Sequence, residues 1–232
     1  MSNRPKLLDL YSGAGGAARG YQRAGFHVTG IDIKPQPRYV GDVFIQGDAL
    51  EYLAMHGHEY AAVHCSPPCQ AFTSLKVMHN AGEHHDLLTP TREILQGLDA
   101  PWVIENVVGS PIQHGILLCG SMFGLGVEVY DGWRQLRRHR WFESSVQMLA
   151  PSCQHNGATI GIYGDHARDR RRKPGVRERG IDFPTTDGLR LGREAMGIDW
   201  MNWKELSQSI PPAFSEYIGV RLMAAIRQER AA

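Results

Sequence analysis

Short apolar runs alternate with segments of helical spacing along the first half of the chain. The runs predict buried strands at residues 6–10, 28–33, 43–46, 60–63 and 102–104. Helical spacing falls between several of them, at 17–24, 49–56 and 87–98. Strands that alternate with helices in this way are typical of parallel βαβ units, so the sequence predicts an α/β fold with a mostly parallel sheet.

The second half of the chain has a weaker pattern. The apolar run 116–119 predicts one more strand, but regular periodicity fades from about residue 142 to residue 191. Helical character returns at 193–203, and an amphipathic helix is predicted at 213–227 after two prolines. We therefore predict a core at 1–141, a small loop-rich insert at 142–192, and a C-terminal segment at 193–232 that returns to the core.

Composition narrows the class of protein. With 232 residues, 42% hydrophobic and 21% charged, the chain can form one large domain or a domain with an insert. Its net charge of +1 gives no general signal for a polyanionic partner, so a nucleic-acid surface must come from local clusters of basic residues. Four unevenly spaced cysteines, no secretory signal and no long apolar run favour a reduced, cytoplasmic setting.

Glycine and carboxylates follow three consecutive strands. The turn Tyr11–Gly16 carries Gly13-x-Gly15-Gly16 after the first strand, which lets backbone approach a nucleotide-like ligand. Asp32 ends the second strand, where an acidic residue accepts hydrogen bonds from ribose hydroxyls, and Asp48 after the third is placed to hold an adenine amino group. A glycine-rich turn alone is often ligand-free, but the three strand ends together favour a nucleoside-type cofactor.

Cys69 is the candidate nucleophile. It follows the strand 60–63 and two prolines that stiffen the loop, at the sheet edge where α/β proteins place their chemistry. The alternative is a small buried hydrophobe, which is the commoner role of a free cysteine. Glu105, at the end of the next strand, is expected to face the same cleft, and the segment 72–86 is expected to act as a lid.

Two groups of arginines are candidates for contacts with phosphate. Arg138 and Arg140 alternate on a segment expected to be extended, so both side chains point one way and suit a phosphate or a base edge. The run from Arg168 to Lys173 is the densest positive cluster of the chain. Either group is also compatible with a merely solvated face.

Histidine and cysteine give no clear metal signal. His79, His84 and His85 lack ligand spacing. Cys153 and His155 are two residues apart and resemble half of a metal site, but no second pair follows them in the sequence. We therefore predict no metal.

The motifs as a set resemble those of the cytosine-5 DNA methyltransferase family, in a short form similar to phage-encoded members. They occur in the family's order and cover most of the chain: Asp9–Gly16, Pro68-Cys69-Gln70, Glu105-Asn106-Val107, Arg138-x-Arg140, Arg193-Glu194-Ala195 and Ser209-Ile210-Pro211-Pro212. Two positions depart from the family pattern. Leu136 stands in place of a glutamine, and Ser207-Gln208 in place of Gly-Asn.

The resemblance implies a Rossmann-like methyltransferase fold, S-adenosylmethionine as cofactor with S-adenosylhomocysteine as product, and double-stranded DNA as partner. It implies no membrane association and no obligate protein partner, in the cytoplasm of a bacterium or a phage-infected cell. The catalytic residues that it implies are Cys69, Glu105, Arg138 and Arg140. Those implied for the cofactor are Tyr11, Gly13, Gly15, Gly16, Asp32, Ile33, Asp48, Ala49, Pro67 and Ser209. Those for DNA are Gln70, Ser74, Arg170, Arg171, Arg172 and Lys173.

By this resemblance the Cys69 thiolate adds to C6 of a flipped-out cytosine, and protonated Glu105 bonds the base. Four alternative functions compete with DNA cytosine methylation, and two of them are disfavoured by the motifs. Methylation of tRNA uses the same motifs, and a silent DNA-binding subunit need not keep both Cys69 and Glu105. The glycine spacing disfavours a nicotinamide oxidoreductase. A zinc deaminase is disfavoured because this sequence lacks the deaminase signature, His-x-Glu with Pro-Cys-x-x-Cys. The transferred group can also be a modified analogue of methyl.

Overall fold

The computed structural model describes residues 4–68, 86–130, 132–164, 166–170, 181–182 and 185–229. Six of the predicted site residues are not among them. Cys69, Gln70, Ser74, Arg171, Arg172 and Lys173 all lie outside the described residues. The predicted lid at 72–86 lies outside them as well, apart from Asp86.

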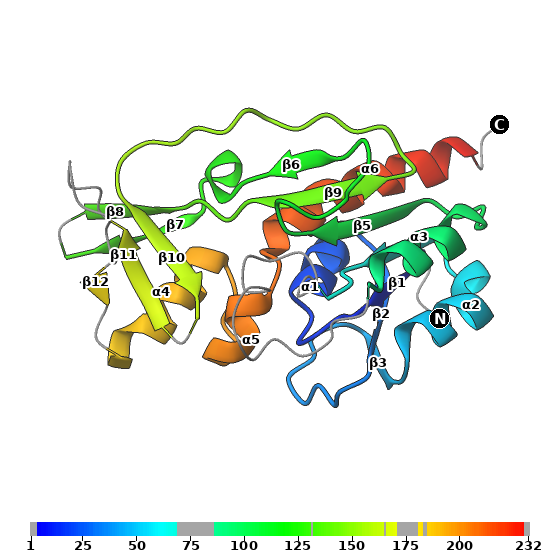
Figure 1. Ribbon diagram of the computed structural model, residues 1–232, viewed down its shortest axis with the longest axis horizontal. Coiled ribbons are helices and arrows are strands. Elements are labelled where there is room, and N and C mark those ends of the chain that lie inside the picture. Colours follow the sequence, from blue (N-terminus) through cyan, green and yellow to red (C-terminus); the bar gives the residue numbers. More distant parts are fainter. Residues whose placement is uncertain are drawn as a thin grey trace.

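A large sheet forms the centre of the molecule (Figure 1). Its strand order is β3-β2-β1-β4-β5-β9-β6, and all neighbouring pairs are parallel except those of β9, which runs antiparallel to β5 and β6. The strands are β1 (Lys6–Leu10), β2 (His27–Asp32), β3 (Val43–Gln46), β4 (Ala62–Cys65), β5 (Trp102–Asn106), β6 (Ile116–Leu118) and β9 (Arg140–Ser144). The predicted α/β fold with a mostly parallel sheet is confirmed.

Helices cover both faces of this sheet. Successive side chains of a strand point to opposite faces, so Leu7 of β1 packs in the core under α1 (Gly16–Arg23) and α6 (Pro212–Glu229). Leu8 and Leu10 pack in a second core with residues of α2 (Ala49–His56) and α3 (Leu88–Gln96). Burial on both faces explains why these strands read as continuous apolar runs.

A smaller sheet lies beside the large one (Figure 1). Its order is β12-β11-β10-β8-β7, and α4 and α5 pack on it. The elements are β7 (Gly126–Val129), β8 (Gly132–Leu136), β10 (Thr159–Tyr163), β11 (His166–Arg170), β12 (Ile181–Asp182), α4 (Thr185–Met196) and α5 (Trp203–Gln208). Two short 3-10 helices, η1 (Gly57–Glu59) and η4 (Gly120–Phe123), complete the described elements.

The second half of the chain differs from the sequence-based prediction. Among its described residues, the segment 142–192 supplies three strands and most of α4, where the sequence pattern predicted mainly loops. The small sheet also takes β7 and β8 from before residue 141, while residues 142–144 belong to the large sheet, so the predicted boundary does not follow the two sheets. The helix expected at 193–203 ends at Met196, because Gly197 adopts a left-handed φ of 66° that terminates a helix.

Among the described residues, no helix combines the length and the apolar character that crossing a membrane requires.

Candidate functional site

The predicted cofactor residues gather where the strand order of the large sheet reverses. β1 lies between β2 and β4, and chain connections leave this point in opposite directions, which opens a crevice at the carboxyl ends of the strands. The turn after β1 has three residues with left-handed backbone: Tyr11 (φ 58°), Gly13 (φ 49°) and Gly15 (φ 84°). This turn leads directly into α1, which begins after Gly15 without a side-chain cap.

Gly16 is required by close packing. A Cβ at this position would overlap Ser209 Oγ and would lie 2.6 Å from the Ile210 carbonyl oxygen. The predicted cofactor residues Gly16 and Ser209 are therefore in direct contact, although they are far apart in sequence. Around Gly13, by contrast, a Cβ would meet nothing within 4 Å among the described residues, so this part of the turn borders open space.

Asp32 joins the glycine turn to the end of β2. Its Oδ2 accepts a hydrogen bond from the Gly13 amide at 3.0 Å, and its Oδ1 accepts one from the Lys34 amide at 2.9 Å. The next side chain, Ile33, is 66% exposed, an unusual state for a large apolar residue at the end of a strand. A carboxylate beside an exposed apolar side chain fits a ligand with a polar ribose and an apolar ring.

Three other predicted cofactor residues border the same crevice. The Asp48 carboxylate caps α2 by accepting from the Glu51 amide at 3.0 Å, and Ala49 is the buried first residue of that helix. The Tyr11 hydroxyl bonds Thr91 Oγ1 of α3 at 3.2 Å. Burial raises the pKa of Tyr11 to about 12, so the phenol stays neutral and holds the turn against α3. The donor set and the open glycine turn fit an adenosine cofactor.

Glu105 is a buried carboxyl group at the end of β5. Its Oε1 accepts an ion-paired hydrogen bond from Arg140 Nε at 2.8 Å, and the side chains of Glu105 and Arg140 are 9% and 18% exposed. Burial raises the pKa of Glu105, and this outweighs the lowering by Arg140, Arg138 and the Ser66 hydroxyl. Two predicted catalytic residues are therefore in contact, and burial makes the carboxyl group easier to protonate than an exposed glutamate.

Sequence analysis missed a buried polar chain that ends on Glu105. Tyr21 Oη and His64 Nδ1 are 2.8 Å apart, and His64 Nε2 and Ser66 Oγ are 2.9 Å apart. Ser66 in turn hydrogen-bonds Glu105 and lowers its pKa, which assigns the hydroxyl as the donor to the carboxyl. Burial lowers the pKa of His64 to about 3, so the ring is neutral, with Nε2–H donating to Ser66 and Nδ1 accepting from Tyr21.

The loop that leads to Cys69 is anchored to the same strand. The Asn106 amide donates to the Pro67 carbonyl at 3.1 Å, and its Oδ1 accepts from the Val107 amide at 2.9 Å. Pro67 is buried, and the Ser66 amide donates to the Leu10 carbonyl of β1 at 3.1 Å. The backbone is thus fixed up to two residues before Cys69, which itself lies outside the described residues.

Arg138, one of the predicted catalytic residues, bonds to backbone carbonyls of two other segments. Its guanidinium is buried and donates to the carbonyl oxygens of Ile162 at 3.0 Å and Ser207 at 2.7 Å. These bonds link the segment before β9 to β10 of the small sheet and to α5. They also give donors to two backbone carbonyl groups that would otherwise need them. Arg138 therefore braces these backbone segments, and its charge also lowers the pKa of Glu105, while Arg140 forms the ion pair with Glu105.

The two departures from the family pattern have structural accounts. Leu136 is 2% exposed in the core of the small sheet, where an amide side chain would lack partners. Ser207 offers its carbonyl to Arg138, a contact that does not depend on the side chain. Of the predicted DNA-binding arginines, only Arg170 is described, as the last residue of β11.

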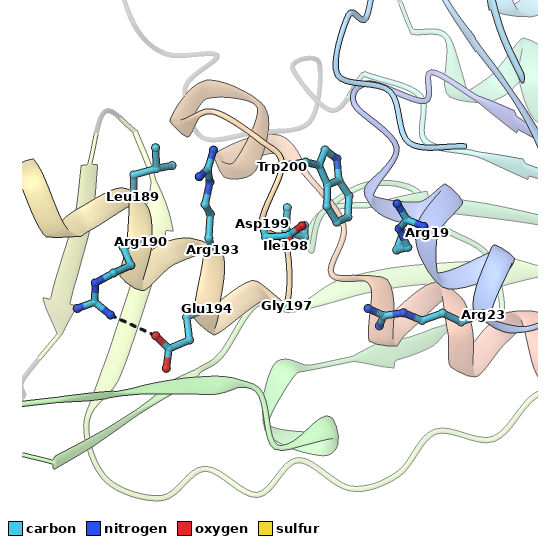
Figure 2. A pocket seen from close by; sticks show the side chains of 10 residues that line it. All are labelled: Arg19, Arg23, Leu189, Arg190, Arg193, Glu194, Gly197, Ile198, Asp199 and Trp200. Carbon is cyan, nitrogen blue, oxygen red and sulfur yellow. Dashed lines mark hydrogen bonds and ion pairs between the residues drawn. The ribbon is translucent and has the colours of Figure 1, made fainter. Parts of the chain in front are cut away.

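An open pocket of about 940 Å³ lies between α1 and α4 (Figure 2). Arg19, Arg23, Arg190 and Arg193 line it, together with Trp200, whose Nε1 donates to the Ala14 carbonyl at 2.9 Å. Two acidic side chains also line the pocket, so its charge is positive on balance. None of the residues predicted for catalysis or cofactor binding lines it, so we do not place the reaction there.

Comparisons with known proteins were made at the level of sequence and of structure. No protein-family model matches the sequence, and no curated protein matches it. Among solved structures, a prophage-encoded protein of E. coli, to which a DNA modification methyltransferase activity is ascribed, aligns over 97% of this chain and 99% of its own, with a TM-score of 0.57 and 14% identity.

Two further solved structures are more distant. Dnmt2 methyltransferase of S. pombe aligns over 61% of this chain and 49% of its own, with a TM-score of 0.43 and 20% identity. A SAM-dependent methyltransferase from Agrobacterium tumefaciens aligns over 62% and 56%, with a TM-score of 0.38 and 16% identity. At these identities the likeness concerns the fold. The chain shares its overall fold with the prophage-encoded protein.

Proposed function

We propose that this chain is an S-adenosylmethionine-dependent DNA methyltransferase that acts on C5 of cytosine. The observation that carries the proposal is the buried Glu105, which pairs with Arg140, lies on the strand that anchors the loop leading to Cys69, and has a pKa raised by burial. A neutral carboxyl group both donates and accepts, as recognition of the N3 and amino groups of cytosine requires.

The crevice at the ends of β1 and β2 is the proposed cofactor site. The glycine turn would receive the amino-acid part, Asp32 the ribose, Ile33 one face of the adenine, and Asp48 its amino group. Bound S-adenosylmethionine supplies an electrophilic methyl group on a sulfonium. Ser209, in contact with Gly16, closes the far side of the turn, and Pro67 borders the site from the β4 loop.

The proposed chemistry assigns a role to each protein group. The Cys69 thiolate adds to C6 of cytosine and makes C5 electron-rich, while Glu105 bonds N3 and the amino group and stabilises charge on the ring. Arg140 holds Glu105 in place and offers its remaining guanidinium edge to the base carbonyl. After C5 takes the methyl group, a base removes the C5 proton, the C6–S bond breaks, and Cys69 leaves as thiolate.

The proposed substrate is double-stranded DNA from which the target cytosine is flipped out, because C5 and C6 cannot be reached in a stacked duplex. Gln70 and Ser74, beside Cys69, and the cluster Arg170 to Lys173 are the proposed DNA contacts. Charge reversal at Arg171 and Arg172 should weaken DNA binding and reduce its dependence on salt. An unchanged salt slope would remove this cluster from the DNA contact surface.

The test uses the full chain, S-adenosylmethionine and mixed-sequence duplex DNA that contains 5-fluorocytosine. Fluorine cannot leave as the proton does, so the protein should stay bound to DNA through Cys69 in denaturant. We expect this adduct with the native chain and with the control Cys65→Ala, but not with Cys69→Ala. An adduct on fluorinated tRNA and none on DNA would move the substrate to RNA. No adduct on either, with cofactor bound, would support a silent DNA-binding subunit.

A further inference from the structure

Four side chains with metal-ligating atoms meet at a place that is separate from the proposed catalytic groups. Cys119 follows β6, His139 precedes β9, and Cys153 and His155 lie in the irregular segment 145–158. One ligand atom from each of these four residues lies within 4.8 Å of those of the other three. They come from three segments of the chain, and the pairing of β6 with β9 in the large sheet brings the segments of Cys119 and His139 together.

The spacing of these atoms suits a tetrahedral ion. Cys119 Sγ is 3.3 Å from His155 Nε2, and Cys153 Sγ is 3.6 Å from His139 Nε2. A tetrahedral zinc ion with Zn–S of about 2.3 Å and Zn–N of about 2.0–2.1 Å requires sulfur and nitrogen to be about 3.5 Å apart. The two imidazole rings are nearly perpendicular, with centroids 5.2 Å apart, so they converge through their nitrogens and do not stack.

The donor set identifies the class of ion. Two thiolates and two imidazoles are the ligands of structural zinc, and four protein donors leave no open position for substrate. Ser121 Oγ donates to Cys119 Sγ at 3.2 Å and accepts from the Gln154 amide at 3.2 Å, an outer contact that orients a sulfur ligand. We propose that Cys119, His139, Cys153 and His155 form a structural zinc site. Binding displaces the two thiol protons, so the site as a whole is neutral.

The proposed ion has a definite structural task. Residues 145–158 contain no helix or strand in the structure. Val146 and Met148 pack against the core, but residues 149–157 are all exposed, so side-chain burial does not hold the part that carries Cys153 and His155. The ion would fix the segment to the end of β6. It would also fix His139, which lies between Arg138 and Arg140 and whose carbonyl accepts from Arg140 at 2.8 Å.

This proposal replaces the expectation of no metal. Sequence reasoning found the pair Cys153 and His155, but its partners are Cys119 and His139, which are 20 residues apart and follow no regular spacing. Only the pairing of β6 with β9 brings that second pair together.

The experiment measures the metal content of the full chain, purified without chelator, by inductively coupled plasma mass spectrometry. We expect one zinc ion per chain, with two sulfur and two nitrogen ligands in X-ray absorption at the zinc edge. Because Cys153 and His155 are exposed, we expect the double variant Cys153→Ser/His155→Ala to fold. Its zinc content per chain should be at least tenfold lower than that of the native chain. The controls Cys65→Ala and His58→Ala, outside the cluster, should keep it.

Cobalt gives a second readout that does not depend on methyl transfer. Co²⁺ added to the metal-free chain should produce the intense visible bands of a tetrahedral thiolate site, and the double variant should not show them. Zinc kept at the native level by the double variant would overturn the proposal, as would a chain that binds neither ion. A disulfide between Cys119 and Cys153 in chain purified under reducing conditions would overturn it too. Because the readouts are metal content and spectra, failure here is separate from failure of the proposed activity.

Discussion

The side-chain amide of Asn106 donates a hydrogen bond to the Pro67 carbonyl 3.1 Å away, and so ties the end of β5 to the loop after β4. This contact joins the strand that carries Glu105 to the backbone two residues before Cys69. It gives a specific reason why an asparagine follows the glutamate, since the same amide group also accepts from the Val107 amide.

Replacing Asn106 by alanine should therefore affect catalysis more than cofactor binding. The buried Pro67 carbonyl loses its donor, which costs about 1–3 kcal/mol of stability. The loop before Cys69 loses its anchor, so we expect turnover to fall at least tenfold while the affinity for S-adenosylhomocysteine changes little. Turnover, calorimetric binding and chemical denaturation measure these effects. Exposed Gln96→Ala is the control, and equal loss of binding and turnover would contradict the anchoring role.

Glu105 should make stability depend on pH. Its pKa in the folded chain is raised above the ordinary 4.5, so the folded state holds a proton that the unfolded state has released. The contribution of Glu105 to the free energy of unfolding should therefore be most favourable below pH 4.5. It should decrease as the pH rises from 4.5 through the raised pKa of the folded state. Glu105→Gln should flatten this part of the pH profile, measured by urea unfolding at several pH values.

The same variant tests whether Glu105 passes its proton to N3 of cytosine as the Cys69 thiolate adds to C6. A glutamine reproduces the donor and acceptor pattern of the protonated glutamate but cannot release a proton. We expect Glu105→Gln to bind DNA normally and to lose about 10²–10⁴-fold in turnover. A variant with native turnover at any pH would remove Glu105 from the proposed chemistry.

Arg138 and Arg140 should differ in what they affect. Arg138→Met leaves the carbonyls of Ile162 and Ser207 without these donors, so we expect a loss of about 1–3 kcal/mol of stability for each buried acceptor. Arg140→Met removes the partner of Glu105 and should lower turnover about 10²–10³-fold with a smaller change in stability. Thermal unfolding and turnover on both variants decide this. The reverse pattern would restore the expectation that Arg138 contacts substrate.

Arg92 and Glu143 form a buried ion pair that fixes α3 to β9. Nε and Nη2 of Arg92 each lie 2.8 Å from a Glu143 oxygen, and the two side chains are 9% and 7% exposed. Arg92→Met should cost about 3–5 kcal/mol, because the buried Glu143 carboxylate keeps only the hydrogen bond from the Gln113 amide and loses its counter-charge. Arg92→Met/Glu143→Leu should recover part of this loss in chemical denaturation. The exposed pair Arg190–Glu194 is the control, where Arg190→Ala should change stability by less than about 1 kcal/mol.

Gly16→Ala tests the contact between the glycine turn and Ser209. The added methyl group would overlap Ser209 Oγ and press on the Ile210 carbonyl, so we expect about 1–3 kcal/mol of destabilisation and weaker binding of S-adenosylhomocysteine. Gly47→Ala is the matched control, because a Cβ there meets nothing within 4 Å among the described residues. Native cofactor affinity in Gly16→Ala would show that this contact does not shape the pocket.

The sequence by itself determined the first half of the fold. Strands buried on both faces, such as β1 and β4, are continuous apolar runs, and the residues at their carboxyl ends meet at one edge whatever the details of packing. For this reason the place of Glu105 at the end of the strand next to β4, the place of Asp32 beside the glycine turn and the predicted α/β fold could be inferred from local pattern alone.

Other features depended on which strands pair across long stretches of chain. The small sheet combines β8 with β10 across 22 residues, and its short strands carry glycines and charges that hide the period of two. The role of Arg138, the buried chain from Tyr21 to Ser66 and the cluster of Cys119 with His155 are likewise contacts between distant segments. Side-chain direction and strand pairing decide such contacts, and the spacing of residues within a short segment predicts neither of them.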